Sequence, residues 1–232
     1  MNTKSTLYIT LVLISIFSVN KPMGIESQKI KKCARRKLNR KLRKAIINNN
    51  LKKIETLLEK GANPNIKIRH MITPLVYAVY EISSPKMVEL LLKYKVDVND
   101  YYKSNEYKAI HLAIRSCNIC ITNLLIDAKA DINIQDCCGN ASLHFLNIKH
   151  RPETSLKLLP LLLNHGGDVN IKNFDNKSFL DLAQEQNKKE IFDIIKEHQK
   201  LIIKKIAEAT KYCLPTVLEN MIGEYIIFLE NK

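Results

Sequence analysis

The sequence predicts an all-α fold in which short helix pairs stack side by side. The chain has 232 residues, of which 46% are hydrophobic and only 6 are Gly and 7 Pro, so it carries enough apolar sequence for a packed core. A short pattern recurs every 34 to 37 residues, and an apolar cluster with helical spacing precedes each copy. These two observations predict a solenoid of about five helix pairs rather than a single globular core.

Each copy of the recurring pattern ends in an asparagine. The copies are GANPN (61–65), KVDVN (95–99), KADIN (129–133) and GGDVN (166–170). The apolar clusters before them are ETLLEK, ELLLKY, NLLIDA and PLLLNH. A pair of short helices cannot bury both of its apolar faces alone, so neighbouring units are expected to share one continuous core.

A second recurring stretch marks the first helix of each pair. It reads ITPLVYAV (72–79), KAIHLAI (108–114), NASLHFL (140–146) and KSFLDLA (177–183). We expect Thr73 to cap its helix and Pro74 to occupy the first turn, where a missing N–H costs nothing. Small residues in these stretches let adjacent helices approach closely; they are Ala78, Ala113 and Ala183.

Together these stretches resemble the ankyrin repeat over residues 38–197, with T-P-L-H-x-A opening a unit and L-L-x-x-G-A-D-x-N closing it. Residues 38–65 resemble an amino-terminal capping unit. Gly61 and Gly166 fit left-handed helix ends, where Lys95 and Lys129 stand in the other units. The resemblance implies protein binding through hairpin fingers, and the finger positions predicted to contact a target are Arg69, His70, Tyr102, Lys103, Cys137 and Phe174.

The histidines and cysteines are better explained by structural roles than by catalysis or metal binding. His111 and His144 are expected to bridge the backbone loops of adjacent repeats. Cys117 and Cys120 form a C-x-x-C pair near the adjacent pair Cys137–Cys138, but adjacent cysteines rarely converge on one zinc ion. The sequence contains no nucleophile elbow, phosphate-binding loop or H-E-x-x-H motif. We therefore predict a protein that is not an enzyme, with no catalytic residues, cofactor or metal.

The fourth unit carries an insertion, KHRPETSLK at 149–157. The register predicts that it lengthens the turn between the two helices of that unit. Longer loops on a regular scaffold often contact partners, so this one is a further candidate for target binding.

The net charge of +14 is concentrated in one segment. Residues 27–54 contain 12 Lys or Arg and no acidic residue, which leaves the rest of the chain nearly neutral. A nucleic-acid-binding domain would carry its charge on its folded surface, so no nucleic-acid partner is expected. The segment fits a solvated helix face or linker, a nuclear-localisation-like patch, or the charged flank of a membrane anchor.

Residues 1–24 form a hydrophobic amino-terminal segment, followed by a basic linker at 25–37. An uncharged run at 7–19 has the shape of a signal peptide but lacks a small-residue cleavage site. It is shorter than a spanning helix, and as an anchor it would hold the remainder in the cytosol. It could also pack on the first repeat. Membrane contact is expected only through residues 7–19, if they are not cleaved.

Two sequons bear on the compartment. Asn140-Ala-Ser142 and Asn176-Lys-Ser178 lie just before predicted first helices, where a sugar would obstruct the fingers. The scattered cysteines also suit a reducing compartment. We therefore expect the cytoplasm, with secretion as the alternative.

The carboxyl-terminal segment, residues 198–232, is predicted to be helical. A helix is expected to start near Leu214-Pro215, and apolar residues follow at helical spacing at Leu218, Met221, Ile222 and Tyr225. This amphipathic stripe fits either a closing cap on the solenoid or a partner-docking helix.

The L-P-x-x-x-x-x-x-I-x-x-Y pattern that ends this array resembles the truncated F-box called PRANC, known from poxvirus ankyrin proteins. The resemblance implies binding to the adaptor of an SCF-type cullin ubiquitin ligase through Leu214, Pro215, Leu218, Ile222 and Tyr225. It further implies a viral adaptor that presents an unknown host target protein to the ligase. The alternative is a plain ankyrin module that masks a host signalling protein, with the tail acting only as a cap.

Overall fold

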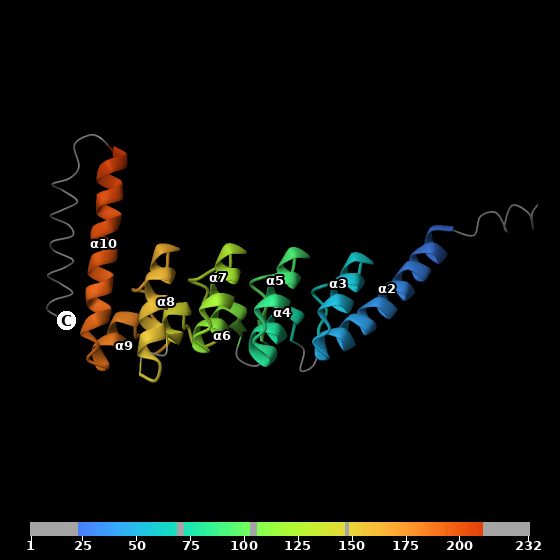
Figure 1. Cartoon of the computed structure of the whole chain (residues 1–232), viewed down its shortest axis with the longest axis horizontal. Helices are drawn as coiled ribbons and strands as arrows, with labels where there is room; N and C mark the ends of the chain where they lie inside the picture. The colour runs from blue at the N-terminus through green and yellow to red at the C-terminus, as the bar shows by residue number, and fades with distance from the viewer. Residues whose placement is uncertain (1–22, 69–71, 103–105, 147–148, 211–232) are drawn as a thin grey trace, which may run out of the picture. The chain divides into compact units, whose positions relative to one another are not determined.

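A computed structural model describes residues 23–68, 72–102, 106–146 and 149–210. In these residues the chain forms five consecutive helix pairs and one two-stranded hairpin (Figure 1). The predicted all-α solenoid of about five helix pairs is confirmed. The expected binding residues of the carboxyl-terminal segment lie outside the described residues, as do three finger positions, Arg69, His70 and Lys103.

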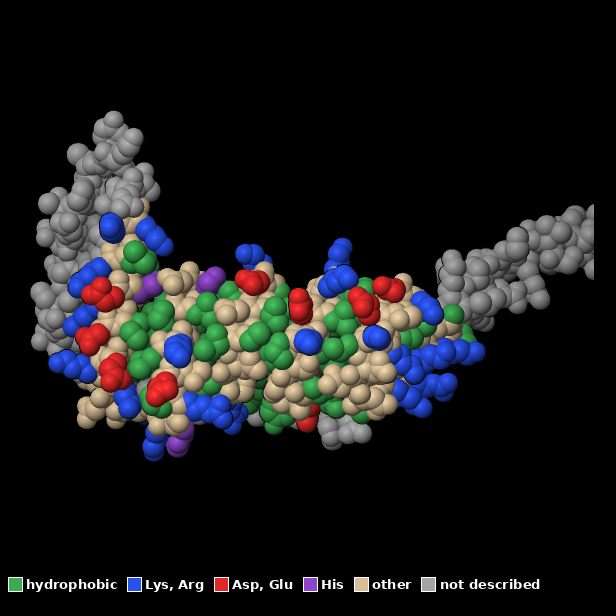
Figure 2. Space-filling model, viewed as in Figure 1, with side chains coloured by type: hydrophobic (Ala, Val, Ile, Leu, Met, Phe, Trp, Pro, Cys, Tyr) green, Lys and Arg blue, Asp and Glu red, His purple; other side chains and the backbone are tan. Residues whose placement is uncertain are grey.

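The chain divides into two compact units, residues 1–63 and 64–232. The first contains α2 (Met23–Ile47) and α3 (Leu51–Glu59). Leu42 and Ile46 of α2 are buried, as are Ile54 and Leu58 of α3, and the two helices pack together. The expected basic linker at 25–37 lies inside α2, and Figure 2 shows the exposed basic side chains of this helix gathered together.

The second unit contains four helix pairs. The first pair is α4 (Pro74–Tyr77), which continues as a π-helical turn η2 (Ala78–Ile82), and α5 (Pro85–Lys93). Next come α6 (Ala109–Arg115) with α7 (Ile119–Asp127), and the 3₁₀ turn η3 (Ser142–Phe145) with α8 (Pro152–Asn164). The last pair is α9 (Phe179–Glu185) with α10 (Lys189–Thr210).

Polar side chains begin most second helices. Ser84 and Asn118 accept the backbone N–H three residues ahead, at 3.3 and 3.0 Å. The prediction for Thr73 was wrong in part: Pro74 does occupy the first turn, but the Thr73 side chain makes no capping bond and its buried hydroxyl has no hydrogen-bond partner. The missing cap follows from burial, because the hydroxyl is enclosed by the apolar packing around it.

The left-handed ends of the second helices are confirmed. Gly61 and Gly166 have φ of +84° and +87°, and Lys95 and Lys129 adopt φ of +54° and +65°. A side chain in this region costs about 1 kcal/mol relative to Gly. The two lysines therefore mark units whose turn is held by packing rather than by residue preference.

The insertion in the fourth unit lengthens the turn between the two helices, as its register predicted: residues 146–151 separate η3 from α8, whereas 116–118 separate α6 from α7. It also extends the second helix, which was not predicted. α8 has 13 residues, whereas α5 and α7 have 9 each. Pro152 starts α8, so most of the insertion adds a turn to that helix, and only residues 149–151 of it lie outside the helix among those described. A proline at the first helical position and the following Glu153 favour helix initiation, which explains the outcome.

α10 is the longest helix after α2, at 22 residues, and Figure 1 shows it extending past the ends of α5, α7 and α8. The expected boundary between residues 197 and 198 lies within this helix. Among the described helices, none is both long and apolar enough to cross a bilayer.

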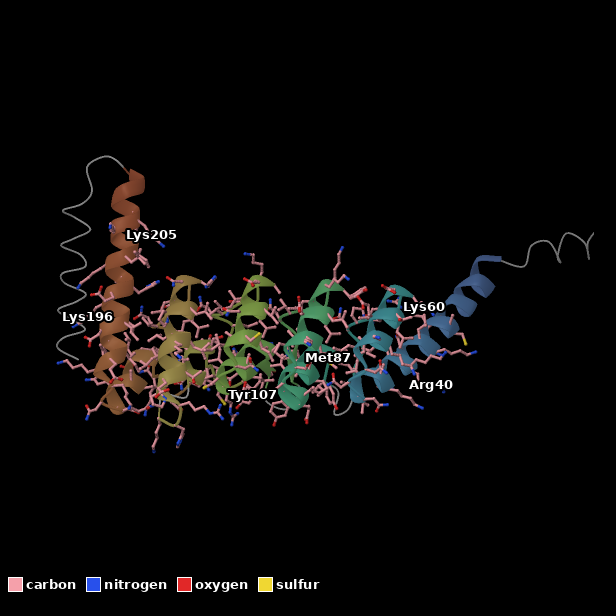
Figure 3. The ribbon with its side chains drawn as sticks, in the orientation of Figure 1. Arg40, Lys60, Met87, Tyr107, Lys196 and Lys205 are labelled. Carbon is pink, nitrogen blue, oxygen red and sulfur yellow. The ribbon has the colours of Figure 1, made fainter. Side chains whose placement is uncertain are left out.

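The core of the second unit is one apolar layer shared by neighbouring helices. Its largest fully buried side chains include Leu75, Met87, Leu91, Ile110, Ile114, Ile121, Leu125 and Phe179. Met87, labelled in Figure 3, lies on α5, which contacts both η2 and α7. The three small residues expected to allow close approach, Ala78, Ala113 and Ala183, are completely buried, which confirms their role.

Candidate protein-binding surface

The hairpin before α6 presents an aromatic ring between two lysines. Strand β1 (Tyr101–Tyr102) pairs antiparallel with β2 (Tyr107–Lys108). The Tyr101 side chain is 41% exposed, and the ammonium groups of Lys108 and Lys67 lie 4.4 and 5.9 Å from its ring centroid. Lys67 also pairs with Asp100 at 2.8 Å, which fixes this end of the hairpin. Tyrosine is among the residues enriched at protein-binding surfaces.

A second aromatic group includes Tyr107 on the other strand of the same hairpin. Tyr107, labelled in Figure 3, packs edge-on against Phe145 with ring centroids 5.4 Å apart, and the guanidinium of Arg115 lies 5.8 Å from the Tyr107 ring. On the other side of Phe145 the ring of His111 stacks at 4.7 Å. Aromatic contacts therefore join the third and fourth repeats beneath the exposed Tyr101.

His111 bridges two repeats, as predicted. Its Nδ1 accepts the Lys108 N–H at 3.4 Å, and its Nε2 lies 2.9 Å from the carbonyl oxygen of Ile134. This arrangement requires the neutral ring with its proton on Nε2. Burial lowers the pKa of His111 to about 4, against the opposing effect of the Ile134 carbonyl. His111 is therefore a structural residue held in its neutral form, and it is unsuited to act as a general base near neutral pH.

His144 repeats the arrangement one unit later. Its Nδ1 accepts the Ala141 N–H at 3.2 Å, and its Nε2 lies 3.1 Å from the carbonyl oxygen of Lys177. The prediction that both histidines bridge adjacent repeats is confirmed.

The next two fingers hold each other. The N–H of Phe174 donates to the carbonyl oxygen of Cys138 at 2.9 Å, and the Asn173 amide donates to the Asn140 side chain at 3.0 Å. Gly139 makes this approach possible, because a Cβ there would lie 2.7 Å from the Phe174 ring. The Phe174 side chain is 78% exposed although its backbone is fixed. A large, exposed and positioned aromatic residue is a strong candidate for a binding contact.

Of the predicted target-binding residues, the structure brings Cys137 and Phe174 onto adjacent fingers, and both side chains are exposed. Tyr102 lies in β1, where it pairs with Tyr107, and its side chain is not described. The sequence reasoning missed Tyr101, its two lysines and the exposed Tyr80. The adjacent tyrosines in the loop could have indicated the first of these.

Sequence reasoning also missed the role of the recurring asparagine. The side-chain oxygens of Asn65, Asn99 and Asn133 each accept a backbone N–H from the following repeat, at 2.9 to 3.0 Å. The three donors are the N–H groups of Asp97, Asp131 and Asp168. We call this series the asparagine ladder. The asparagine is visible in the sequence because it ends every copy of the recurring pattern. The spacing alone does not reveal the N–H group that donates to its side chain.

The cysteines of the described residues are free thiols. Cys117 is buried in the turn after α6 and Cys120 is exposed on α7, while the sulfur atoms of Cys137 and Cys138 lie 3.9 Å apart. Within the described part of the chain, no three His, Cys, Asp or Glu side chains gather in an arrangement that could hold a metal ion.

The alternating helix pairs, the fingers and the histidine bridges agree with the model of one protein family. Residues 42–136 match the description "Ankyrin repeats (3 copies)". This part of the chain is similar to ankyrin repeats. A crystal structure of the ankyrin repeat protein EF0377 has the same fold, with a TM-score of 0.59 and 23% identity over 66% of this chain and 78% of that one.

Similar proteins come from animals and large DNA viruses. The human "SH3 and multiple ankyrin repeat domains protein 2" is 29% identical over 74% of this chain, and an ankyrin repeat protein of fowlpox virus, FPV031, is 29% identical over 62%. An ankyrin repeat protein of Acanthamoeba polyphaga mimivirus is 34% identical over 56%. The matched region spans 9%, 43% and 22% of these relatives.

Ankyrin repeats form a protein–protein interaction module, and they typically have no enzymatic activity of their own. In this chain the exposed aromatic residues on the fingers, rather than any catalytic group, form the candidate site. Its chemistry is the binding of another protein by aromatic and cationic side chains on a rigid scaffold.

Proposed function

We propose that this protein is a viral adaptor, without enzymatic activity, that presents a host protein to an SCF-type cullin ubiquitin ligase. The repeats bind the target and the carboxyl-terminal segment binds the ligase adaptor. The observation that carries the first half is the pair of exposed, positioned aromatic residues on the fingers, Tyr101 and Phe174. Similarity to ankyrin repeat proteins of fowlpox virus and mimivirus supports a viral origin.

The second half rests on the amino-acid pattern of the carboxyl-terminal segment. Leu214 and Pro215 precede apolar residues at the spacing of an F-box-like helix, and the resemblance assigns adaptor contacts to Leu218, Ile222 and Tyr225. Apolar residues on one side of a helix are the usual means by which such a segment enters a partner groove.

The two halves are tested separately on the full chain. Capture of the purified ligase adaptor is compared between the parent and the triple variant Leu214→Ala, Pro215→Ala and Ile222→Ala. We expect the triple variant to lose capture by at least tenfold. The matched control, Tyr101→Ala with Phe174→Ala, should capture the adaptor normally but lose the host target in affinity purification from human cells. Equal capture by parent and triple variant, or capture by neither, would remove the ligase function.

A plain binding module that masks a host signalling protein is the second candidate. It is favoured by the fact that the described candidate contacts, Tyr101, Cys137 and Phe174, all lie on the fingers. Deletion of residues 212–232 separates the two functions. A truncated chain that binds its target but fails to bind the adaptor supports the ligase role, whereas loss of solubility and of cooperative melting supports a capping role.

We place the protein in the cytoplasm of the host cell. The free thiols of Cys117, Cys120, Cys137 and Cys138 suit a reducing compartment. Asn140 and Asn176, the two glycosylation acceptors, lie in finger loops close to Phe174. Expression in animal cells tests this assignment: a glycosidase-sensitive band would establish secretion instead.

A further inference from the structure

The carboxyl-terminal half of α2 is covered with exposed basic side chains. Between positions 32 and 44 they are Lys32, Arg35, Arg36, Lys37, Arg40, Lys41, Arg43 and Lys44. Figure 2 shows them gathered on this helix, and Arg40 is labelled in Figure 3. Positions 27–54 contain 12 Lys or Arg and no acidic residue, so most of the net charge of +14 lies on this helix and beside it.

All but one of these side chains share one side of the helix. A helix turns by about 100° per residue, so seven of them fall within an arc of about 180°. We call these seven the basic face; they are Lys32, Arg36, Lys37, Arg40, Lys41, Arg43 and Lys44. The buried residues Leu42, Ala45 and Ile46 occupy the remaining arc, where α2 packs against α3. One side of α2 therefore serves the fold, and the other side is basic.

Like charges stand one helical turn apart on the basic face. It contains two rows with a spacing of four residues, namely Lys32, Arg36, Arg40 and Lys44, and Lys37 with Lys41. Like charges at this spacing repel each other and destabilise a helix. α2 itself contains a single acidic residue, Glu26. An anionic partner on this side would remove the repulsion.

The shape and composition of the basic face favour a lipid surface as that partner. The row from Lys32 to Lys44 is straight and about 18 Å long, so a flat anionic surface contacts all of it at once. Positions 20–76 contain no Phe, Trp or Tyr on which the bases of a single-stranded nucleic acid could stack. Clusters of about four to eight Lys or Arg on a helix are typical of segments that bind anionic lipids.

The sequence before α2 contains a second feature of membrane proteins. Residues 7–19, which lie outside the described residues, form an uncharged and mostly apolar run. A single apolar anchor or a single basic patch gives only reversible attachment, whereas the two together hold a protein on a membrane. The positive-inside rule places a basic segment beside such a run in the cytosol. Anionic phospholipids are concentrated on that side of the membrane.

We propose that the basic face of α2 binds the anionic phospholipid headgroups on the cytosolic surface of a membrane. The lysine and arginine side chains donate to headgroup oxygens, and Leu42 and Ile46 stay packed against α3, so contact is with headgroups rather than acyl chains. This extends the expected membrane contact beyond residues 7–19. The inference stands apart from the ligase function. If both hold, the host target is presented at a membrane surface.

Sedimentation with lipid vesicles tests the proposal on the full chain. One set of vesicles is phosphatidylcholine alone, and the other contains about one-third phosphatidylserine. The face variant is Arg36→Gln, Arg40→Gln and Lys44→Gln. The matched control is Lys200→Gln, Lys204→Gln and Lys205→Gln, which removes the same charge from exposed positions of α10. Glutamine is a good helix former, so both variants keep their helices.

We expect the parent to partition at least tenfold more strongly into the vesicles that contain phosphatidylserine. The face variant should lose at least tenfold of that partitioning, and the control less than threefold. Equal partitioning of the parent into both kinds of vesicle would overturn the proposal. Equal losses in the two variants would also overturn it, because binding would then follow net charge rather than the basic face. Ligase-adaptor capture by the face variant is measured in parallel, so the two functions fail separately.

A nucleic acid is the alternative partner, and competition decides between the two. A short DNA duplex is added to the vesicle-bound parent at the same concentration of phosphate as of phosphatidylserine. We expect most of the chain to stay on the vesicles. Transfer of the chain to the duplex would assign the basic face to nucleic acid and overturn the proposal.

A second measurement needs no substitution. Cys33 is exposed and lies in the middle of the basic face, about 20° around the helix from Arg40. We expect vesicles with phosphatidylserine to slow its alkylation by a maleimide at least fivefold, and phosphatidylcholine vesicles to leave it unchanged. The control is the exposed thiol of Cys120 on α7, which should react at the same rate throughout. An unchanged rate at Cys33 in vesicle-bound protein would show that the basic face points away from the lipid.

Discussion

The third and the fifth repeats begin with the same local hydrogen bond, from the backbone N–H of the capping residue to the side chain three residues later. They differ in the other hydrogen bonds that this side chain forms. In the third, His111 accepts an N–H from the start of its own helix and reaches the carbonyl oxygen of Ile134 in the next repeat. In the fifth, Asp181 occupies the same place after the cap, and its carboxylate accepts from both the N–H and the hydroxyl of Ser178, at 2.9 and 2.6 Å. The histidine at this place joins two repeats, whereas the aspartate caps the start of its own helix.

The second helices of the two repeats differ at their ends. Ten residues after the start of α7 the chain turns at Lys129 with φ of +65°. The equivalent position in α10 is Gln199, and the helix continues to Thr210. Apolar residues persist on α10 at Ile202 and Ile206, so continuing the helix extends its apolar face. The two helices therefore diverge at this position, where the chain after α7 turns and α10 continues.

The largest effect is expected at the histidine bridge. His111→Ala removes two hydrogen bonds and a stacked ring from a fully buried site, so we expect a loss of about 2–4 kcal/mol in the free energy of unfolding. Asp181→Ala, which removes the capping bonds to Ser178, should cost about 1 kcal/mol. Urea denaturation of both variants measures the difference. A smaller loss for His111→Ala than for Asp181→Ala contradicts the proposed division of roles.

The same histidine should make stability depend on pH. Its pKa is lowered to about 4 in the folded state from 6.5, so the unfolded chain binds a proton that the folded chain does not. Its contribution is complete above pH 6.5 and is lost as the pH falls toward 4, by up to about 3 kcal/mol. The control is His111→Gln, whose stability should fall less over that range. Parallel pH profiles for the two proteins would show that His111 does not titrate in this way.

The equivalent turn positions should respond with opposite signs to the same substitution. Lys129→Gly relieves a left-handed conformation and should raise the free energy of unfolding by about 1 kcal/mol. Gln199→Gly places glycine inside α10 and should lower it by about 1 kcal/mol. Thermal melting of the two variants beside the parent checks this. Changes of the same sign would mean that the turn and the extended helix are not alternatives set by this position.

The smallest effect is expected at the capping residues. Ser178→Ala removes a capping box and should cost about 1 kcal/mol. Thr73→Val removes a buried hydroxyl that lacks a partner, so it should leave stability unchanged or raise it by about 1 kcal/mol. Chemical denaturation separates the two, and a clear loss for Thr73→Val would indicate that the hydroxyl is bonded.

Much of the fold follows from sequence because the repeat signals are local. Left-handed residues such as Gly61 and Gly166, the proline at 74 and the small residues between helices each act over a few positions. The failures arose where a local preference competes with its surroundings. Thr73 has the right side chain for a cap but is enclosed by apolar packing, and the inserted Pro152 starts a helix where a loop was expected.

The candidate site was less predictable. Cys137 and Phe174 are exposed at finger positions, where the repeat register places them, and their contact with a target stays a prediction. Tyr101 was missed because its surroundings include two lysines from other parts of the chain. Lys67 is distant from it in the sequence, and Lys108 lies across the hairpin. Contacts between separate segments of the chain determine such a site, and one sequence does not contain them explicitly.

The asparagine ladder has a consequence for how such a chain can change its length. Each rung joins an asparagine of one unit to a backbone N–H of the next, so duplication of a whole unit in frame copies the donor and the acceptor together. The new junction then forms the same bond as the old one without any compensating substitution. Genes that encode such arrays can therefore gain or lose whole units by recombination and still specify a continuous stack.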